Sequence, residues 1–281
     1  MRKTTGWLLT VTIAVAIAAA VVFAPRREAP QPAVAPPAEN PPPPAAEIEP
    51  LRRFPVPQAG ADSGATDTAP GNEPPQPLPP LRDSDAALLE SLGRQLDPDR
   101  LGKLLIVKNL IKRLVVTIDN LPRAKLPLRR LPTTPPPGKF QVAKTADGAT
   151  EIAPANYARY EDYVRLVEDL DTQALVSVYF HFYPLFQQAY SELGYKSAYF
   201  NDRLVEVIDH LLATPKLTAP VRLVQPSVYY KYADPRLESL SAGQKILIRI
   251  GNDNATKLKA KLQELRDALV MHGRKTVIPP A

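Results

Sequence analysis

The stretch DTQALVSVYFHFYPLFQQAYSELG, residues 171–194, sets the fold class of this chain. Asp171 can cap a helix at its start, and Gly194 can end one. Between them, six residues fall within about 100° of one another on a helical wheel, while most of the remaining surface is apolar or aromatic. These six residues are Gln173, Ser177, His181, Pro184, Gln188 and Glu192. The pattern predicts a central helix with one narrow polar stripe, and a kink or break at Pro184 because proline has no backbone N–H.

Further helices are expected on both sides of this stretch. Capping residues and apolar periodicity place them at about 85–94, 99–119, 156–170, 199–213, 242–250 and from Asp253 or Asn254 onward. The helix at 99–119 has apolar residues around nearly its whole circumference, which predicts burial, although its β-branched end at 115–118 also suits a strand. The alternation of three isoleucines leaves a strand open at 242–250 as well.

Short extended segments complete the expected fold. The runs 140–144 and 150–153 enclose an Asp-Gly turn and predict a small β-hairpin. Residues 221–232 suit short strands or extended chain, and their fold stays open at this point. The sequence therefore predicts a mostly α fold, with one helical domain at residues 81–273, a small β-hairpin and extended Pro-rich loops.

The N-terminal part of the chain has the composition of an anchor and a spacer. Residues 7–24 carry no charge and, as a helix, would be about 27 Å long, close to the hydrocarbon core of a bilayer. We expect a cytoplasmic stub at 1–6 and a transmembrane anchor at 7–24; a cleaved signal peptide ending near Ala20 is the alternative. Residues 25–80 hold 18 of the 33 prolines, which predicts a disordered spacer. Residues 274–281 are expected to be a flexible tail.

Composition excludes several chemistries. With no cysteine, the chain can have no disulfide framework, thiol nucleophile or cysteine-ligated metal. A metal site built from Asp202, Glu206 and His210 would lack a second histidine on that helix face, so a solvated acidic face is favoured. Ser177 and His181 are one helical turn apart, but no Gly-x-Ser-x-Gly turn accompanies them. We therefore expect no catalytic residue, no metal and no cofactor.

Positive charge is concentrated in one segment. Residues 99–144 contain 11 basic residues against Asp99 and Asp119. Part of this charge lies in a proline-stiffened loop, which can present cations to an anionic partner with little ordering cost. The alternative is a solvated loop whose cations pair with Asp202, Glu206 or Asp209.

The tyrosines are clustered as well, with all 11 between Tyr157 and Tyr232. They can line a binding groove, or they can be core residues, as the spacing of Tyr157 and Tyr160 before Val164 would suit. Asn120, which precedes Leu121-Pro122, can either end a helix or bind a ligand. The candidate binding residues are Asn120, Arg123, Lys125, Arg129, Arg130, His181 and Tyr183.

Several stretches scattered over about residues 78–270 carry a further signal. They are VVTIDNLPR (115–123), PPGKF (136–140), YPLFQQAY (183–190), FNDR (200–203), DHLLATP (209–215), ADP (233–235) and LSAGQK (240–245). In this order they resemble a bacterial family known only as domain of unknown function 3014. The resemblance implies one domain and a membrane-anchored protein. That family has no assigned activity, so the resemblance transfers no catalytic residue.

These observations together predict a membrane-anchored, non-catalytic binding or scaffolding module of the bacterial cell envelope. Its C-terminal domain would lie in the periplasm or extracytoplasmic space, anchored in the inner (cytoplasmic) membrane through residues 7–24. The expected partner is an anionic envelope polymer, a lipid head group or an acidic protein, whereas nucleic acid does not fit this compartment. The alternatives are a cell-envelope enzyme with a polar site around His181, Asp202 and His210, and a purely structural homo-oligomer.

Overall fold

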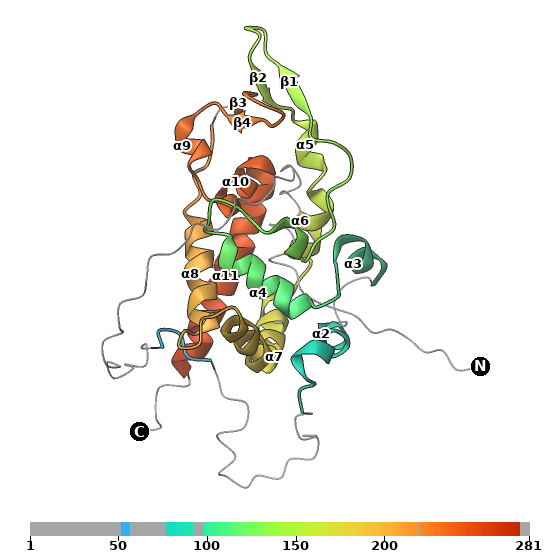
Figure 1. Cartoon of the computed structure of the whole chain (residues 1–281), viewed down its shortest axis with the longest axis vertical. Helices are drawn as coiled ribbons and strands as arrows, with labels where there is room; N and C mark the ends of the chain where they lie inside the picture. The colour runs from blue at the N-terminus through green and yellow to red at the C-terminus, as the bar shows by residue number, and fades with distance from the viewer. Residues whose placement is uncertain (1–51, 57–76, 93–97, 219, 276–281) are drawn as a thin grey trace, which may run out of the picture.

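The computed structural model describes residues 52–56, 77–92, 98–218 and 220–275, which form a body of helices with a small sheet at one end (Figure 1). The helices are η2 (Leu81–Asp83), α2 (Ser84–Leu92), α3 (Pro98–Leu104), α4 (Leu110–Asn120), η3 (Leu128–Arg130), α5 (Ala155–Ala158), α6 (Glu161–Glu168), α7 (Thr172–Glu192), α8 (Phe200–Leu212), α9 (Pro235–Glu238), α10 (Ala242–Arg249) and α11 (Asn252–Lys275). The main core lies where α4 packs on α7 and α8, and α11 packs on α6, α7 and α8. The expectation of a mostly helical fold is confirmed.

The predicted stub at 1–6 and the predicted anchor at 7–24 lie outside the described residues. The same holds for most of the predicted spacer and for the last six residues of the predicted tail, while α11 continues to Lys275. Within the described part, no helix has the length and apolar character needed to cross a membrane.

The central helix is α7, as residues 171–194 predict. The Asp171 carboxylate accepts the Ala174 N–H at 2.7 Å and so caps the helix. The helix continues through Pro184 for 21 residues in all, so the predicted break does not occur. Phe182 and Leu185, on either side of this proline, are buried in the core. Packing on these side chains outweighs the one backbone hydrogen bond that proline removes.

The apolar run at 99–119 forms two helices, α3 and α4, where the sequence predicts one. Asn109 has a left-handed backbone (φ 56°) immediately before α4. The Asp85 carboxylate of α2 accepts the N–H of Asn109 at 2.7 Å and the N–H of Leu110 at 2.8 Å, so α4 is capped from another helix. Apolar residues surround the whole run because two helices bury different sides of it. The strand alternative for 115–118 is wrong, since α4 continues to Asn120.

The helix predicted at 156–170 is also divided, into α5 and α6. Asn156 is buried inside α5 instead of capping a long helix. Its side chain accepts the Gln141 N–H at 2.9 Å and donates to the Gln141 carbonyl oxygen, which joins α5 to the chain entering the first strand. The contact with the Gln141 backbone therefore decides the role of Asn156.

The sheet is a four-stranded antiparallel meander in the order β1-β2-β3-β4. Its strands are β1 (Val142–Lys144), β2 (Thr150–Ile152), β3 (Arg222–Val224) and β4 (Lys231–Tyr232). The predicted hairpin is β1 with β2, in a register that pairs Val142 with Ile152. Residues 221–232, whose fold the sequence left open, supply β3 and β4. A second, small core beneath the sheet contains Ile152, Val221, Leu223, Tyr232 and Ile248.

The other predicted helices, α2, α8, α10 and α11, are confirmed. Ser241 and Gln244 form the predicted capping box of α10, in which the Gln244 N–H donates to Ser241 Oγ at 3.2 Å. Both isoleucines at 246 and 248 lie in this helix, so the strand alternative at 242–250 is wrong. The four leucines of α11 at 258, 262, 265 and 269 are buried, as their spacing predicts.

Candidate functional site

The basic loop, residues 123–130, is fixed at its far end by a side chain of α4. Arg113 Nη1 donates to the carbonyl oxygens of Arg129 at 3.0 Å and Leu131 at 2.9 Å. An arginine that binds two carbonyl oxygens holds the backbone around η3 in one position. The far end of the loop therefore has a defined shape set by α4.

The near end of the basic loop is fixed by the start of α10. The Ala242 N–H donates to the Arg123 carbonyl oxygen at 2.7 Å, and the Gly243 N–H donates to the Leu121 carbonyl oxygen at 2.9 Å. A Cβ at position 243 would lie only 2.6 Å from Leu211 Cδ2. Glycine thus allows α10 to approach the loop and α8 this closely, and the loop is held at both ends.

Three cations of the loop, Lys125, Arg129 and Arg130, are exposed. In the described part of the chain, no residue pairs with their side chains by an ion pair or hydrogen bond. The three carboxylates of α8 that could pair with a solvated loop have other partners. Asp202 contacts residues 53 and 54, Glu206 pairs with Arg53 and Arg203, and Asp209 pairs with Arg266.

Arg123 differs from these three, because it belongs to the Asp119 cluster (Asp119, Arg123, Tyr195, Arg203 and Glu206). The Asp119 side chain is only 4% exposed. It accepts Arg123 Nη2 at 2.7 Å, the Tyr195 hydroxyl at 3.2 Å and Arg203 Nε at 3.1 Å. Arg203 also pairs with Glu206 at 3.1 Å. One buried carboxylate thus joins the start of the basic loop to α8.

Tyrosines pack around this cluster mainly as core residues. Tyr190 stacks on Tyr195 with ring centroids 4.5 Å apart. Burial, followed by the nearby Asp119 charge, raises the pKa of Tyr190 to about 12, so its hydroxyl stays protonated at neutral pH. Tyr160 and Tyr163 are buried, as a core stripe requires, and the other nine tyrosines are buried or half-buried. The tyrosine spacing therefore mainly reflects packing in the core.

Two further candidate residues have local structural partners. Asn120 Nδ2 donates to the Val116 carbonyl oxygen at 2.7 Å, which matches the helix-ending role. The Tyr183 hydroxyl donates to Gln187 Oε1 at 3.0 Å, and burial raises the pKa of Tyr183 to about 12. Gln187 Oε1 also accepts the Phe200 N–H at 2.8 Å. Tyr183 thus supports the connection between α7 and α8.

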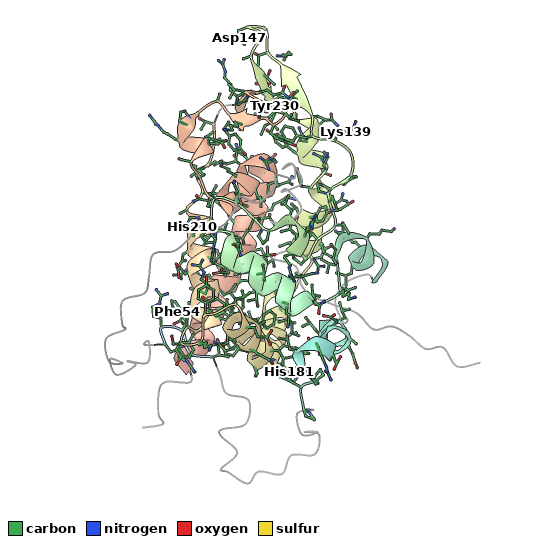
Figure 2. The ribbon with its side chains drawn as sticks, in the orientation of Figure 1. Phe54, Lys139, Asp147, His181, His210 and Tyr230 are labelled. Atoms are coloured by element: carbon green, nitrogen blue, oxygen red, sulfur yellow. The ribbon has the colours of Figure 1, made fainter. Side chains whose placement is uncertain are left out.

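The two histidines of the enzyme alternative lie in different places. Figure 2 shows His181 at the lower end of the molecule, well away from His210. The His181 ring meets Phe182 edge-on at 4.9 Å, whereas His210 Nε2 is 2.8 Å from Ser241 Oγ. Burial, followed by the positive charge of Arg203, lowers the pKa of His210. Among the described residues, no group of three or more histidine, aspartate or glutamate side chains could hold a metal ion.

Two features of this region differ from what the sequence predicts. Asp202, expected on a solvent-facing acidic stripe, is only 8% exposed. It is covered by residues 52–56, which lie on the domain although the sequence predicts a disordered spacer there. One signal was present: Phe54 is the only aromatic residue in 25–80. The second feature is the burial of Asp119, whose arginine partner Arg203 is distant in sequence.

The stretches that carry the family resemblance meet in this region. Five of these stretches each supply a residue that makes a contact described above between α4, α7, α8 and α10. These residues are Asp119, Gln187, Arg203, His210 and Gly243. A family model described as "Protein of unknown function (DUF3014)" matches residues 110–266. No curated protein and no solved structure matches the chain. Because the matched residues make up more than half of its length, the chain belongs to the DUF3014 family.

Proposed function

We propose that this protein is a membrane-anchored, non-catalytic binding or scaffolding module of the bacterial cell envelope, whose basic loop engages an anionic partner. The observation that carries the proposal is a loop fixed at both ends that leaves Lys125, Arg129 and Arg130 exposed and without a described partner. Anchoring through residues 7–24 is supported by their length and lack of charge.

The fixed backbone favours binding because it lowers the ordering cost. A free loop would lose conformational entropy when its cations meet a ligand, whereas this loop is already held by Arg113 and by the start of α10. Arg129 and Arg130 can each donate two parallel hydrogen bonds to a phosphate or carboxylate, and Lys125 adds a point charge. In this proposal Arg123 is a positioning residue, because Asp119 already holds its guanidinium.

The partner class is tested with the full-length chain in nanodiscs of zwitterionic lipid. The probes are phosphatidylglycerol vesicles, soluble polyphosphate and polyglutamate, which represent a lipid head group, an anionic polymer and an acidic polypeptide. The test variant is the triple reversal Lys125/Arg129/Arg130→Glu. The matched control is Lys216/Lys231/Arg236→Glu, which makes the same charge change at three exposed cations outside the loop.

We expect the wild-type chain to bind at least one probe. The affinity of the loop variant should be about 100-fold lower, because each of the three cations contributes about 1 kcal/mol to the binding free energy. The control should change the affinity by less than about threefold, and salt should weaken all binding. The proposal fails if the wild-type chain binds none of the probes. It also fails if both variants weaken binding equally, because net charge alone would then explain the effect.

A further inference from the structure

Residues 52–56 lie along the start of α8 in the way that a bound peptide would. The Asp202 carboxylate accepts two consecutive backbone N–H groups, from Arg53 at 2.9 Å and from Phe54 at 2.8 Å. Asn201 Nδ2 donates to the Phe54 carbonyl oxygen at 2.9 Å. Two neighbouring side chains of the domain thus hold the main chain of the segment through three hydrogen bonds.

The side chains of the segment also have partners of matching chemistry. The Arg52 guanidinium lies 4.2 Å from the centroid of the Tyr199 ring, which is a cation–π contact. Arg53 is 3.7 Å from Glu206. Phe54 packs against the main core, and Figure 2 shows its ring at the side of the domain that carries α8. Each of the three side chains at 52–54 therefore has a partner of matching chemistry on the domain.

The receiving groups are held in position by the domain itself. Asn201 is fully buried, and its Oδ1 accepts the Tyr179 hydroxyl at 3.1 Å, which orients the amide nitrogen toward the segment. Asp202 lies in the first turn of α8, where the helix dipole favours a carboxylate. In the described part of the chain, only Arg53 and Phe54 hydrogen-bond to this carboxylate. Docking of the segment therefore both covers this carboxylate and supplies its two N–H donors.

We propose that Tyr199, Asn201, Asp202 and Glu206 form a peptide-binding site, the α8 peptide site. Its ligand is a short extended segment with two basic residues followed by an aromatic residue and proline. Residues 52–56 fill the site in cis. Five residues make a contact too small to be strong by itself, and covalent attachment sustains it through a high effective concentration. The segment is thus a reversible latch between the spacer and the domain.

Docking shortens the chain that precedes the domain. An extended Pro-rich chain rises about 3.1 Å per residue, so residues 25–80 could reach at most roughly 170 Å from an anchor. With residues 52–56 docked, only residues 25–51 precede the attachment point, and the limit falls to roughly 84 Å. This consequence rests on the proposed anchor, whereas the α8 peptide site does not.

The first test measures trypsin cleavage after Arg53 in the full-length chain, with cleavage after Arg27 as an internal reference. Docking should protect Arg53, and Asp202→Ala should speed cleavage there at least about tenfold, since each hydrogen bond to a charged group is worth that much. Phe54→Ala, which keeps all four residues of the α8 peptide site, should do the same. Asp209→Ala is the matched control on α8 and should leave cleavage after Arg53 unchanged.

Two outcomes of this test would overturn the proposal. One is that wild-type Arg53 is cut as fast as Arg27. The other is that protection of Arg53 rises with protein concentration, because the segment would then dock on a second copy. Neither readout involves an anionic partner, so failure here would leave the proposed role of the basic loop standing.

The second test asks whether the site binds a separate peptide. A fluorescent peptide of residues 50–58, PLRRFPVPQ, is titrated into full-length Phe54→Ala protein, whose own segment is weakened. Saturable binding is expected, with at least about tenfold lower affinity for the Phe54→Ala/Asp202→Ala double variant. A peptide that lacks the phenylalanine should bind equally weakly. Equal binding to the single and double variants would show that Asp202 does not recognise the segment.

Discussion

Replacing Asp119 with asparagine tests whether the Asp119 cluster holds the basic loop to α8. The substitution keeps the shape of the side chain but removes its charge and one of its two acceptor oxygens. Arg203 Nε bonds to Oδ1 at 3.1 Å and Arg123 Nη2 bonds to Oδ2 at 2.7 Å, so one amide cannot accept from both arginines. Arg203 would then keep Glu206 as its charged partner in the cluster.

The size of the effect follows from how exposed each arginine is. A hydrogen bond to a charged group contributes about 1.5–3 kcal/mol, and an exposed ion pair at most about 1 kcal/mol. The Arg203 side chain is only 19% exposed, so we count nearly the full energy of its hydrogen bond to Asp119. The Arg123 side chain is 53% exposed. For Arg123 we therefore count about 0.5 kcal/mol or less. The expected loss for Asp119→Asn is about 2–3 kcal/mol, or about 4–12 °C in Tm.

Thermal and denaturant unfolding of the full-length chain measure this loss, with Asp209→Asn as the matched control. Asp209 lies on α8 and also pairs with an arginine, Arg266, but its side chain is 45% exposed. The control should therefore lose less than about 1 kcal/mol. Equal losses in the two variants would refute the reasoning that burial makes the Asp119 ion pairs important for stability.

Two further predictions concern packing and pH. Gly243→Ala should lower the unfolding free energy by about 1–3 kcal/mol, because its Cβ would lie 2.6 Å from Leu211 Cδ2. Gly102→Ala, with nothing within 4 Å of its Cβ, should raise the unfolding free energy by up to about 1 kcal/mol, and equal effects in denaturant titrations would contradict the packing argument. Burial and the positive charge of Arg203 lower the pKa of His210 below its usual value of 6.5, so the unfolded chain binds the proton first as pH falls. The unfolding free energy of the wild-type chain should therefore fall as pH falls from 6.5 toward the lower pKa of His210 in the folded chain. His210→Gln should lose less unfolding free energy between about pH 7.5 and about pH 5. Equal losses in the two proteins would show that His210 does not cause this pH dependence.

Part of the candidate site could be predicted from the sequence. Prolines and basic residues in one loop indicate a stiff cationic segment, and Lys125, Arg129 and Arg130 are indeed exposed there. Arg123 has the same residue type and lies in the same loop, yet its guanidinium pairs with Asp119. Sequence patterns report residue type and local spacing, and they do not report which carboxylate lies within reach.

Other site predictions depended on contacts between distant segments. Asp202 has the spacing of an exposed helix face, but residues 52–56 cover it and bring two N–H donors to it. His181 and His210 are polar residues among aromatics in the sequence, and the fold places them apart. A single aromatic residue, Phe54, was the local signal for docking, and it does not identify the surface on which it packs.

The elements whose signals are local can be predicted from the sequence. Capping side chains and apolar spacing within one turn or a few turns define α7, α8, α10 and α11, and an Asp-Gly turn defines the hairpin of β1 with β2. The tertiary structure alone decided the division of residues 99–119, the strands in 221–232 and the partners of Asp119 and Asp202. A hydrogen-bonding group pairs with whichever partner the packed chain brings near. Asp85, for example, caps α4 from another helix, and no residue next to α4 in the sequence indicates this contact.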